Sequence, residues 1–160
     1  MKNSNNQSKK QWPQRKKPAT GVFISPDQPT IVFLTVCTKN RIQWLARSEV
    51  HELLVDVWKQ ANAWLVGYYL LMPDHVHLFC APKDMVTPLD EWVTYWKRLF
   101  SKKHSETNWK WQSQKWDTRL RRTESYEEKW NYVRHNPVRK NLVTNPDDWP
   151  YQGVLNELRW

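Results

Sequence analysis

The stretch Met72-Pro73-Asp74-His75-Val76-His77-Leu78-Phe79 decides how the rest of the chain is interpreted. It has the composition of a β-strand that carries two histidines two residues apart. Because side chains alternate between the faces of a strand, His75 and His77 point to the same side. Two imidazoles about 7 Å apart along the backbone can close on one metal ion. Taken alone, the pattern also fits two histidines that only satisfy buried hydrogen bonds.

Length and composition indicate one globular domain. The chain has 160 residues, of which 39% are hydrophobic, and a mean hydropathy of −0.86. Its longest apolar run is too short for a membrane span, and the basic N-terminus lacks the apolar core of a signal peptide. Cys37 and Cys80 are too few for a disulfide framework. We therefore expect a protein of the reducing cytoplasm, with no membrane partner.

The charge is strongly positive and unevenly distributed. Net charge is +9, from 25 basic and 16 acidic residues. Residues 1–20 hold six basic residues and no acid, so the remaining chain has a net charge of +3. We expect residues 1–20 to be a disordered basic tail. Residues 95–122 carry nine basic residues and only two acids, a pattern that favours a nucleic-acid partner over a merely solvated surface.

Four strands are expected from apolar and β-branched runs. The first and most apolar, residues 30–38, is predicted to be buried. The next two, residues 65–72 and 75–81, flank Pro73-Asp74, which breaks the pairing and predicts a tight turn between antiparallel strands. Alternating aromatic and polar residues at 109–122 indicate a last short strand or hairpin.

Three helices are expected between these strands. Apolar residues at helical spacing predict the first from an N-cap at Ser48 to about residue 62. A second should begin at Pro88, after an N-cap at Thr87, and end near residue 104. The capping box Ser125-x-x-Glu128 predicts a third, over about residues 126–135, which Pro137 ends.

The order strand, helix, strand, strand, helix, strand, helix predicts an α+β fold. We expect a ferredoxin-like antiparallel sheet of four to five strands, with the helices on one face and the two histidines on a central strand. Residues 21–152 should form this single domain, followed by an irregular C-terminal tail at 153–160.

The last helix supplies candidates to complete a metal site. Tyr132 and Asn136 are four residues apart and so share one helix face. The amide oxygen of Asn136 is a possible third ligand beside His75 and His77, and such a set suits Mg²⁺ or Mn²⁺. Tyr132 would then lie beside the ion, where a tyrosine can form a covalent intermediate. A tyrosine that packs in the core and an asparagine that caps the helix fit the same spacing.

Two motifs together carry a family resemblance. Residues 72–78 (MPDHVHL) and 132–139 (YVRHNPVR) resemble the single-tyrosine transposases of the His-hydrophobic-His class, and within it the REP-associated tyrosine transposases. Residues 33–41 (FLTVCTKNR), Trp111-Gln112, Trp116-Asp117 and Leu142-Val143 are also similar to this family. The resemblance covers about residues 30–151. Asp74 stands where many relatives have Asn, and Asn136 replaces the Gln of the insertion-sequence members.

The resemblance implies a metal-dependent enzyme that cuts and rejoins single-stranded DNA, often beside a hairpin of REP-like palindromic repeats. His75, His77 and Asn136 would hold Mg²⁺ or Mn²⁺, and Tyr132 would attack the scissile phosphate to give a 5′-phosphotyrosine. The protein would be nucleoid-associated and either a monomer or a homodimer. The basic residues expected to contact phosphates are Lys97, Arg98, Arg119, Arg121, Arg122, Arg134 and Arg139.

Two other classes of function compete with this interpretation. One is a hairpin-binding module that has lost catalysis, against which the presence of all four candidate site residues argues. The other is a metal-dependent hydrolase that uses bound water, in which His135 or His104 joins His75 and His77. The twelve tryptophans are not explained by the resemblance, although some could stack on unpaired bases.

Overall fold

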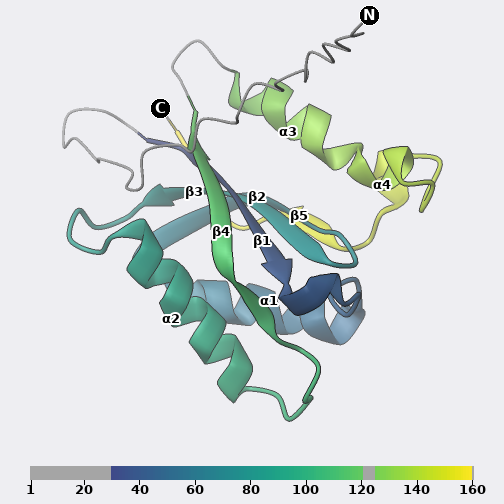
Figure 1. The fold of residues 1–160 in the computed structure, drawn as a ribbon. Coiled ribbons are helices and arrows are strands. Elements are labelled where there is room, and N and C mark those ends of the chain that lie inside the picture. The colour runs from purple at the N-terminus through teal and green to yellow at the C-terminus, as the bar shows by residue number, and fades with distance from the viewer. Residues whose placement is uncertain (1–29, 121–124, 160) are drawn as a thin grey trace, which may run out of the picture.

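A five-stranded antiparallel sheet forms the middle layer of the structure, a computed structural model that describes residues 30–120 and 125–159 (Figure 1). The strands lie in the order β4-β1-β3-β2-β5, so that β3 is central. The first four have the order of a ferredoxin-like sheet, and the expected α+β class is confirmed. The strands are β1 (Val32–Thr38), β2 (Trp64–Leu71), β3 (His75–Pro82), β4 (Trp111–Arg119) and β5 (Gln152–Val154).

The helices cover both faces of the sheet, whereas the sequence led us to expect them on one. The helices α1 (Ser48–Gln60) and α2 (Leu89–Lys102) pack on one face against Leu34, Val36 and Leu78. The helix α3 (Tyr126–Arg134) packs on the opposite face, followed by the short α4 (Asn136–Arg139). Two short 3₁₀ turns, η1 (Lys39–Arg41) and η2 (Pro146–Asp148), complete the described elements.

The two faces follow from strand alternation in β1 and β3. Even-numbered apolar residues of both strands face α1 and α2, in a core rich in tryptophan. Odd-numbered residues face α3, and among them Phe79 packs beside Tyr126 and Trp130. Because His75 and His77 are odd-numbered, they point to the layer that holds α3. Cys80 lies on the other face, as parity predicts.

Helix starts agree with the sequence at α3 and differ at the other two long helices. The Ser125 side chain accepts a hydrogen bond from the Glu128 backbone N–H, so that cap is confirmed. For α1, Arg47 has the extended backbone of an N-cap and Ser48 is already helical. For α2, Pro88 occupies the cap position, while the Thr87 hydroxyl bonds the Asp84 carboxylate. The N-caps predicted at Ser48 and Thr87 are therefore wrong.

The sheet extends beyond the C-terminal boundary expected at residue 152. Strand β5 pairs with β2, where Gln152 lies opposite Leu70 and Val154 opposite Tyr68. Leu158 is buried in the layer under α3. A strand of three residues is too short to show an alternating hydrophobic pattern, so β5 could not be predicted from the sequence. The basic tail expected at residues 1–20 lies outside the described residues.

Candidate active site

The two histidines of β3 meet on the sheet face that α3 covers. The Nε2 atoms of His75 and His77 are 3.1 Å apart. On the far side of each ring, His75 Nδ1 lies 2.7 Å from Asp74 Oδ1, and His77 Nδ1 lies 2.8 Å from Thr35 Oγ1. The four side chains therefore form one continuous hydrogen-bonded chain across β1 and β3.

Only certain positions of the protons on the two imidazoles allow every hydrogen bond in this series of side chains to form. A carboxylate only accepts hydrogen bonds, so His75 Nδ1 donates to Asp74 and His75 Nε2 carries a lone pair. Without a metal ion, the Thr35 hydroxyl donates to His77 Nδ1, and His77 Nε2–H donates to His75. A hydroxyl can also accept a hydrogen bond. In the other tautomer of His77, Nδ1 carries the proton and donates to Thr35, and the Nε2 atoms of both histidines then have lone pairs free to bind one cation.

The geometry of the pair fits a divalent ion. Neighbouring ligands placed about 2.1 Å from one octahedral ion stand about 3.0 Å apart, close to the 3.1 Å between the Nε2 atoms. Ring nitrogens held from behind by a carboxylate and a hydroxyl are typical of metal-binding histidines. Within the described residues, no group of three His, Cys, Asp or Glu could hold an ion. Among the described residues, a third protein ligand would therefore be of another type, such as an amide oxygen.

The electrostatic surroundings keep both imidazoles neutral and favour an anionic ligand. Burial is the largest of the effects that together lower the pKa of His77 to about 3; the neighbouring His75 and the positive charges of Arg41, Lys129 and Arg139 act in the same direction. Burial also lowers the pKa of His75, an effect that Asp74 partly offsets. A neutral imidazole is the form that binds metal, and the surrounding cations suit a phosphate.

Asp74 is fixed by two partners. Its second carboxylate oxygen accepts from Arg41 Nε at 2.8 Å. Burial alone would raise the pKa of Asp74, but His75 and Arg41 together hold it below the usual value. Arg41 reaches this position from a backbone with φ of 57°, next to Asn40 with φ of 55°. Two successive left-handed residues other than glycine are uncommon and cluster at functional sites. Sequence reasoning missed both Thr35 and Arg41 as parts of the site.

Contacts between side chains place α3 over the histidines. The Phe33 ring stacks on His77 with centroids 5.2 Å apart, and Lys129 Nζ lies 5.4 Å from the centre of the Phe33 ring. Tyr132 follows Lys129 by one helical turn and so lies on the same side of α3. Its side chain is 65% exposed rather than packed in the core. The alternative of a core tyrosine does not hold.

Arg139 joins the two candidate residues of α3 and α4. Its guanidinium carbon lies 4.3 Å from the centre of the Tyr132 ring, and Nη2 donates to the Tyr132 carbonyl at 2.8 Å. Nη2 also donates to the amide oxygen of Asn136. In the described part of the chain, that oxygen therefore contacts Arg139 rather than the histidines. Asn136 can become a metal ligand only after its amide turns away from Arg139.

The other predicted phosphate contacts are dispersed. Lys97 and Arg98 lie on α2, across the sheet from the histidines, and Lys97 Nζ donates to the Gln112 carbonyl at 2.8 Å. Burial and Lys115 lower the pKa of Lys97 to about 8. Arg134 pairs with Asp147, and Arg119 is exposed at the end of β4. Arg121 and Arg122 lie outside the described residues.

The histidines proposed for a hydrolase do not join the pair. His104 follows α2 and packs against Phe100 and Trp109 in the other layer. His135 bonds through Nδ1 to the Asn131 carbonyl, 2.6 Å away. The described structure therefore brings together two imidazoles, not three.

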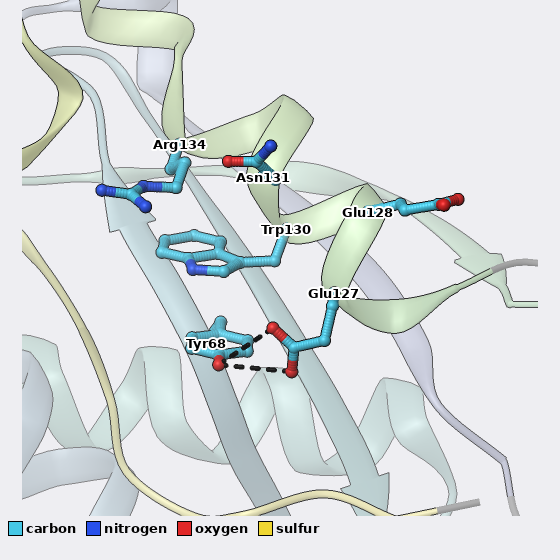
Figure 2. Close-up of a pocket in the computed structure, with 6 residues that line it drawn as sticks. All are labelled: Tyr68, Glu127, Glu128, Trp130, Asn131 and Arg134. Carbon is cyan, nitrogen blue, oxygen red and sulfur yellow. Dashed lines mark hydrogen bonds between the residues drawn. The ribbon is translucent and has the colours of Figure 1, made fainter.

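An open hollow lies beside α3 (Figure 2). The Tyr68 and Trp130 rings stack with centroids 4.7 Å apart, and the Tyr68 hydroxyl donates to the Glu127 carboxylate. Glu128, Asn131 and Arg134 complete its lining. These contacts attach α3, the helix that carries Tyr132, to β2.

The fold and the site define a class of protein: a His-x-His motif lies on a central strand, and a helix that carries an exposed tyrosine packs on the same face of the sheet. Comparison with known proteins agrees. The chain is 26% identical over 136 residues to the REP-associated tyrosine transposase of Escherichia coli (strain K12), covering 79% of this chain and 77% of that protein. The resemblance expected from the two motifs is thereby confirmed.

A solved structure matches the fold. It is that of a REP-associated tyrosine transposase bound to a REP hairpin, with a TM-score of 0.66 and 21% identity, over 77% of this chain and 75% of the other. No family model matches the sequence. None of the helices described for this chain is long and apolar enough to cross a membrane.

Proposed function

We propose that this protein is a metal-dependent endonuclease and strand transferase that acts on single-stranded DNA beside hairpins. One observation carries the proposal: two neutral imidazoles converge within 3.1 Å on the sheet face under the helix of an exposed tyrosine. The basic groups around them, and the name of the relative in Escherichia coli, point to DNA as the substrate. We place its action in the cytoplasm, at the nucleoid.

The chain's own residues account for most of the chemistry. Tyr132 Oη attacks the phosphorus of the scissile phosphodiester while the bond to the 3′ oxygen breaks. The tyrosine hydroxyl gives up its proton, the 3′ oxygen takes up a proton and leaves as a hydroxyl, and the 5′ phosphate remains bonded to the tyrosine. Rejoining reverses these steps, since attack by a 3′-hydroxyl breaks the phosphotyrosine bond and returns the proton to Oη. The phosphoester energy is kept, so no nucleotide cofactor is consumed.

Cation placement supports this role for Tyr132. Arg139 stacks on its ring and, with Lys129, offers positive charge where the phosphate would lie. Mg²⁺ or Mn²⁺ held by His75, His77 and the turned amide of Asn136 would supply further charge to polarise the phosphate. Lys97 and Arg98 are not part of this proposal because they lie on the opposite layer.

The test is a covalent-adduct assay. Labelled REP hairpin DNA with single-stranded flanks is incubated with the protein and Mg²⁺ or Mn²⁺, then resolved on a denaturing gel. We expect a protein–DNA adduct that Tyr132→Phe abolishes. Tyr95→Phe is the matched control, because Tyr95 is also exposed, at 52%, but lies on α2.

Three results would contradict the proposal. An adduct that survives in Tyr132→Phe would exclude this nucleophile. Cleavage with no adduct in the wild type would indicate a hydrolase that uses water. Binding with no cleavage of any hairpin probe would indicate a binding module.

A further inference from the structure

Trp116 differs from the other tryptophans in its exposure. Ten of the twelve tryptophans lie in the described residues, and seven of these are buried. Trp109 and Trp111 are partly buried against the core under α1 and α2. Trp116 alone among the ten is exposed, at 48% of its side chain. Core packing therefore accounts for nine of them and leaves the exposure of Trp116 to be explained.

The register places Trp116 on the same face as the histidines. Trp116 lies opposite Thr35 on β1, and Thr35 lies opposite His77 on β3. Directly paired residues in antiparallel strands project to one side of the sheet. The Thr35 hydroxyl touches His77, which fixes that side as the histidine side. Trp116, Thr35 and His77 thus form one row across the sheet.

Trp116 also lies close enough to the two histidines to contact a nucleotide next to the scissile phosphate. Strands β4 and β3 are two strand spacings apart, or about 10 Å. That distance is within reach of the nucleotides next to a phosphate held at the histidines. Among the described strands, β4 lies at one edge of the sheet (Figure 1), which places Trp116 near the rim of the histidine face rather than at its centre.

The surroundings of Trp116 favour a base over a protein partner. On the same face of β4, its neighbours two residues away are Gln114 and Thr118, both polar and exposed. Lys129 projects over Phe33, which is paired with Thr118. An exposed aromatic ring with polar and cationic groups around it is the pattern of single-stranded nucleic-acid sites, not of a large apolar docking surface.

We propose that Trp116 is a stacking platform for one unpaired base of the DNA strand whose phosphate lies at the histidines. This inference rests on the proposed function and adds a residue that positions the DNA strand. Any base presents a ring face to the indole, so Trp116 fixes the position of the strand rather than its sequence.

A binding assay without divalent metal tests the platform separately from catalysis. Fluorescence anisotropy would follow the labelled REP hairpin with single-stranded flanks, in EDTA. We expect Trp116→Leu to weaken binding by about 5- to 150-fold, the range for loss of one stacked base, and Trp116→Phe to retain most of the affinity. Tyr95→Leu, the matched exposed aromatic on α2, should bind like the wild type. Thermal unfolding of each variant verifies that it is folded.

A second set of probes locates the base. Abasic sites are placed one at a time through the flanks of the hairpin. At one position the wild type should lose as much affinity as Trp116→Leu does, and the variant should lose no more. If each abasic site lowered the affinity of Trp116→Leu as much as it lowers that of the wild type, the proposal would be overturned. Wild-type affinity of Trp116→Leu for the intact hairpin would also overturn it. A change from dimer to monomer on gel filtration that accounts for the weaker binding would also overturn it, since Trp116 would then be a protein contact.

The adduct assay run in parallel separates the two proposals. Adduct formation with unchanged DNA affinity in Trp116→Leu refutes the platform and leaves the strand transferase standing. Weaker DNA binding by Trp116→Leu, together with no adduct in the wild type, supports the platform and refutes the strand transferase. Failure of the wild-type protein to bind the hairpin refutes both.

Discussion

Asp74 and Thr35 hold the rings of the two histidines in fixed orientations, which a His-x-His motif cannot do by itself. Each holds the ring nitrogen that faces away from the partner ring, at 2.7 and 2.8 Å. The ring planes and the direction of the Nε2 lone pairs are thereby fixed before any ion arrives. Preorganisation of this kind removes much of the entropy cost of gathering ligands.

Loss of the Asp74 carboxylate should weaken metal binding. We expect Asp74→Ala to lower the affinity for Mn²⁺ about 10- to 100-fold, because His75 loses the partner that orients it. Isothermal titration calorimetry of the DNA-free protein measures this directly. Asp148→Ala removes an exposed carboxylate of η2 and should leave the affinity unchanged. Equal affinities for Asp74→Ala and wild type would show that the carboxylate does not support a metal ligand.

The depressed pKa of His77 predicts how stability depends on pH. Its pKa is about 3 in the folded protein and 6.5 in the unfolded chain, so between these values the unfolded state binds more protons. The free energy of unfolding therefore rises with pH across this window and falls on acidification. From pH 7 to pH 5, His77 alone should cost about 2 kcal/mol of metal-free stability.

Urea unfolding in EDTA at the two pH values checks this dependence. His75, whose pKa is also lowered, acts in the same direction over this range, whereas the lowered pKa of Asp74 affects stability only at more acidic pH. His77→Gln removes one contribution and should show a smaller loss than the wild type. An identical loss in both proteins would mean that His77 titrates normally in the fold.

At the scale of elements, the position of α3 decides what Tyr132 can reach. The helix is short, at nine residues, and is fixed at its start by the Ser125 cap and along its length by Trp130 stacking on Tyr68. At its end the chain turns at His135 into α4, whose Arg139 reaches back to Tyr132. Short helices depend on such caps and packing, because their own hydrogen bonds are few.

Removing the Ser125 cap should destabilise the protein measurably. Ser125→Ala leaves the Glu128 N–H without its partner, 3.2 Å away, and should lower the free energy of unfolding by about 1 kcal/mol. Chemical denaturation measures the change. Ser113→Ala, at an exposed position of β4, is the matched control and should stay within experimental error of the wild type. A cost at Ser125 no larger than at Ser113 would show that the cap contributes nothing.

At the scale of the whole molecule, the sheet separates two layers with different tasks. The layer of α1 and α2 buries Trp58, Trp64, Trp92 and Trp96 and supplies most of the apolar core. The opposite layer is smaller and leaves Tyr132 and Trp116 in solvent on one side of the sheet. Large hydrophobic burial on one face thus stabilises a fold whose other face can remain partly open for a substrate.

Local sequence alone determined the four longer strands, the capping box at Ser125 and the common face of His75 and His77, because these depend on periodicity and neighbouring residues. It also indicated the family resemblance, which needs only the two motifs.

Only the tertiary structure decided which layer α3 occupies, that Thr35 and Asp74 hold the histidines, and that Lys97 lies across the sheet. It also singled out Trp116, since strand register, not composition, sets it in the row of His77. The physical reason is that these relations join residues far apart in the chain, and packing of two cores on one sheet fixes them together.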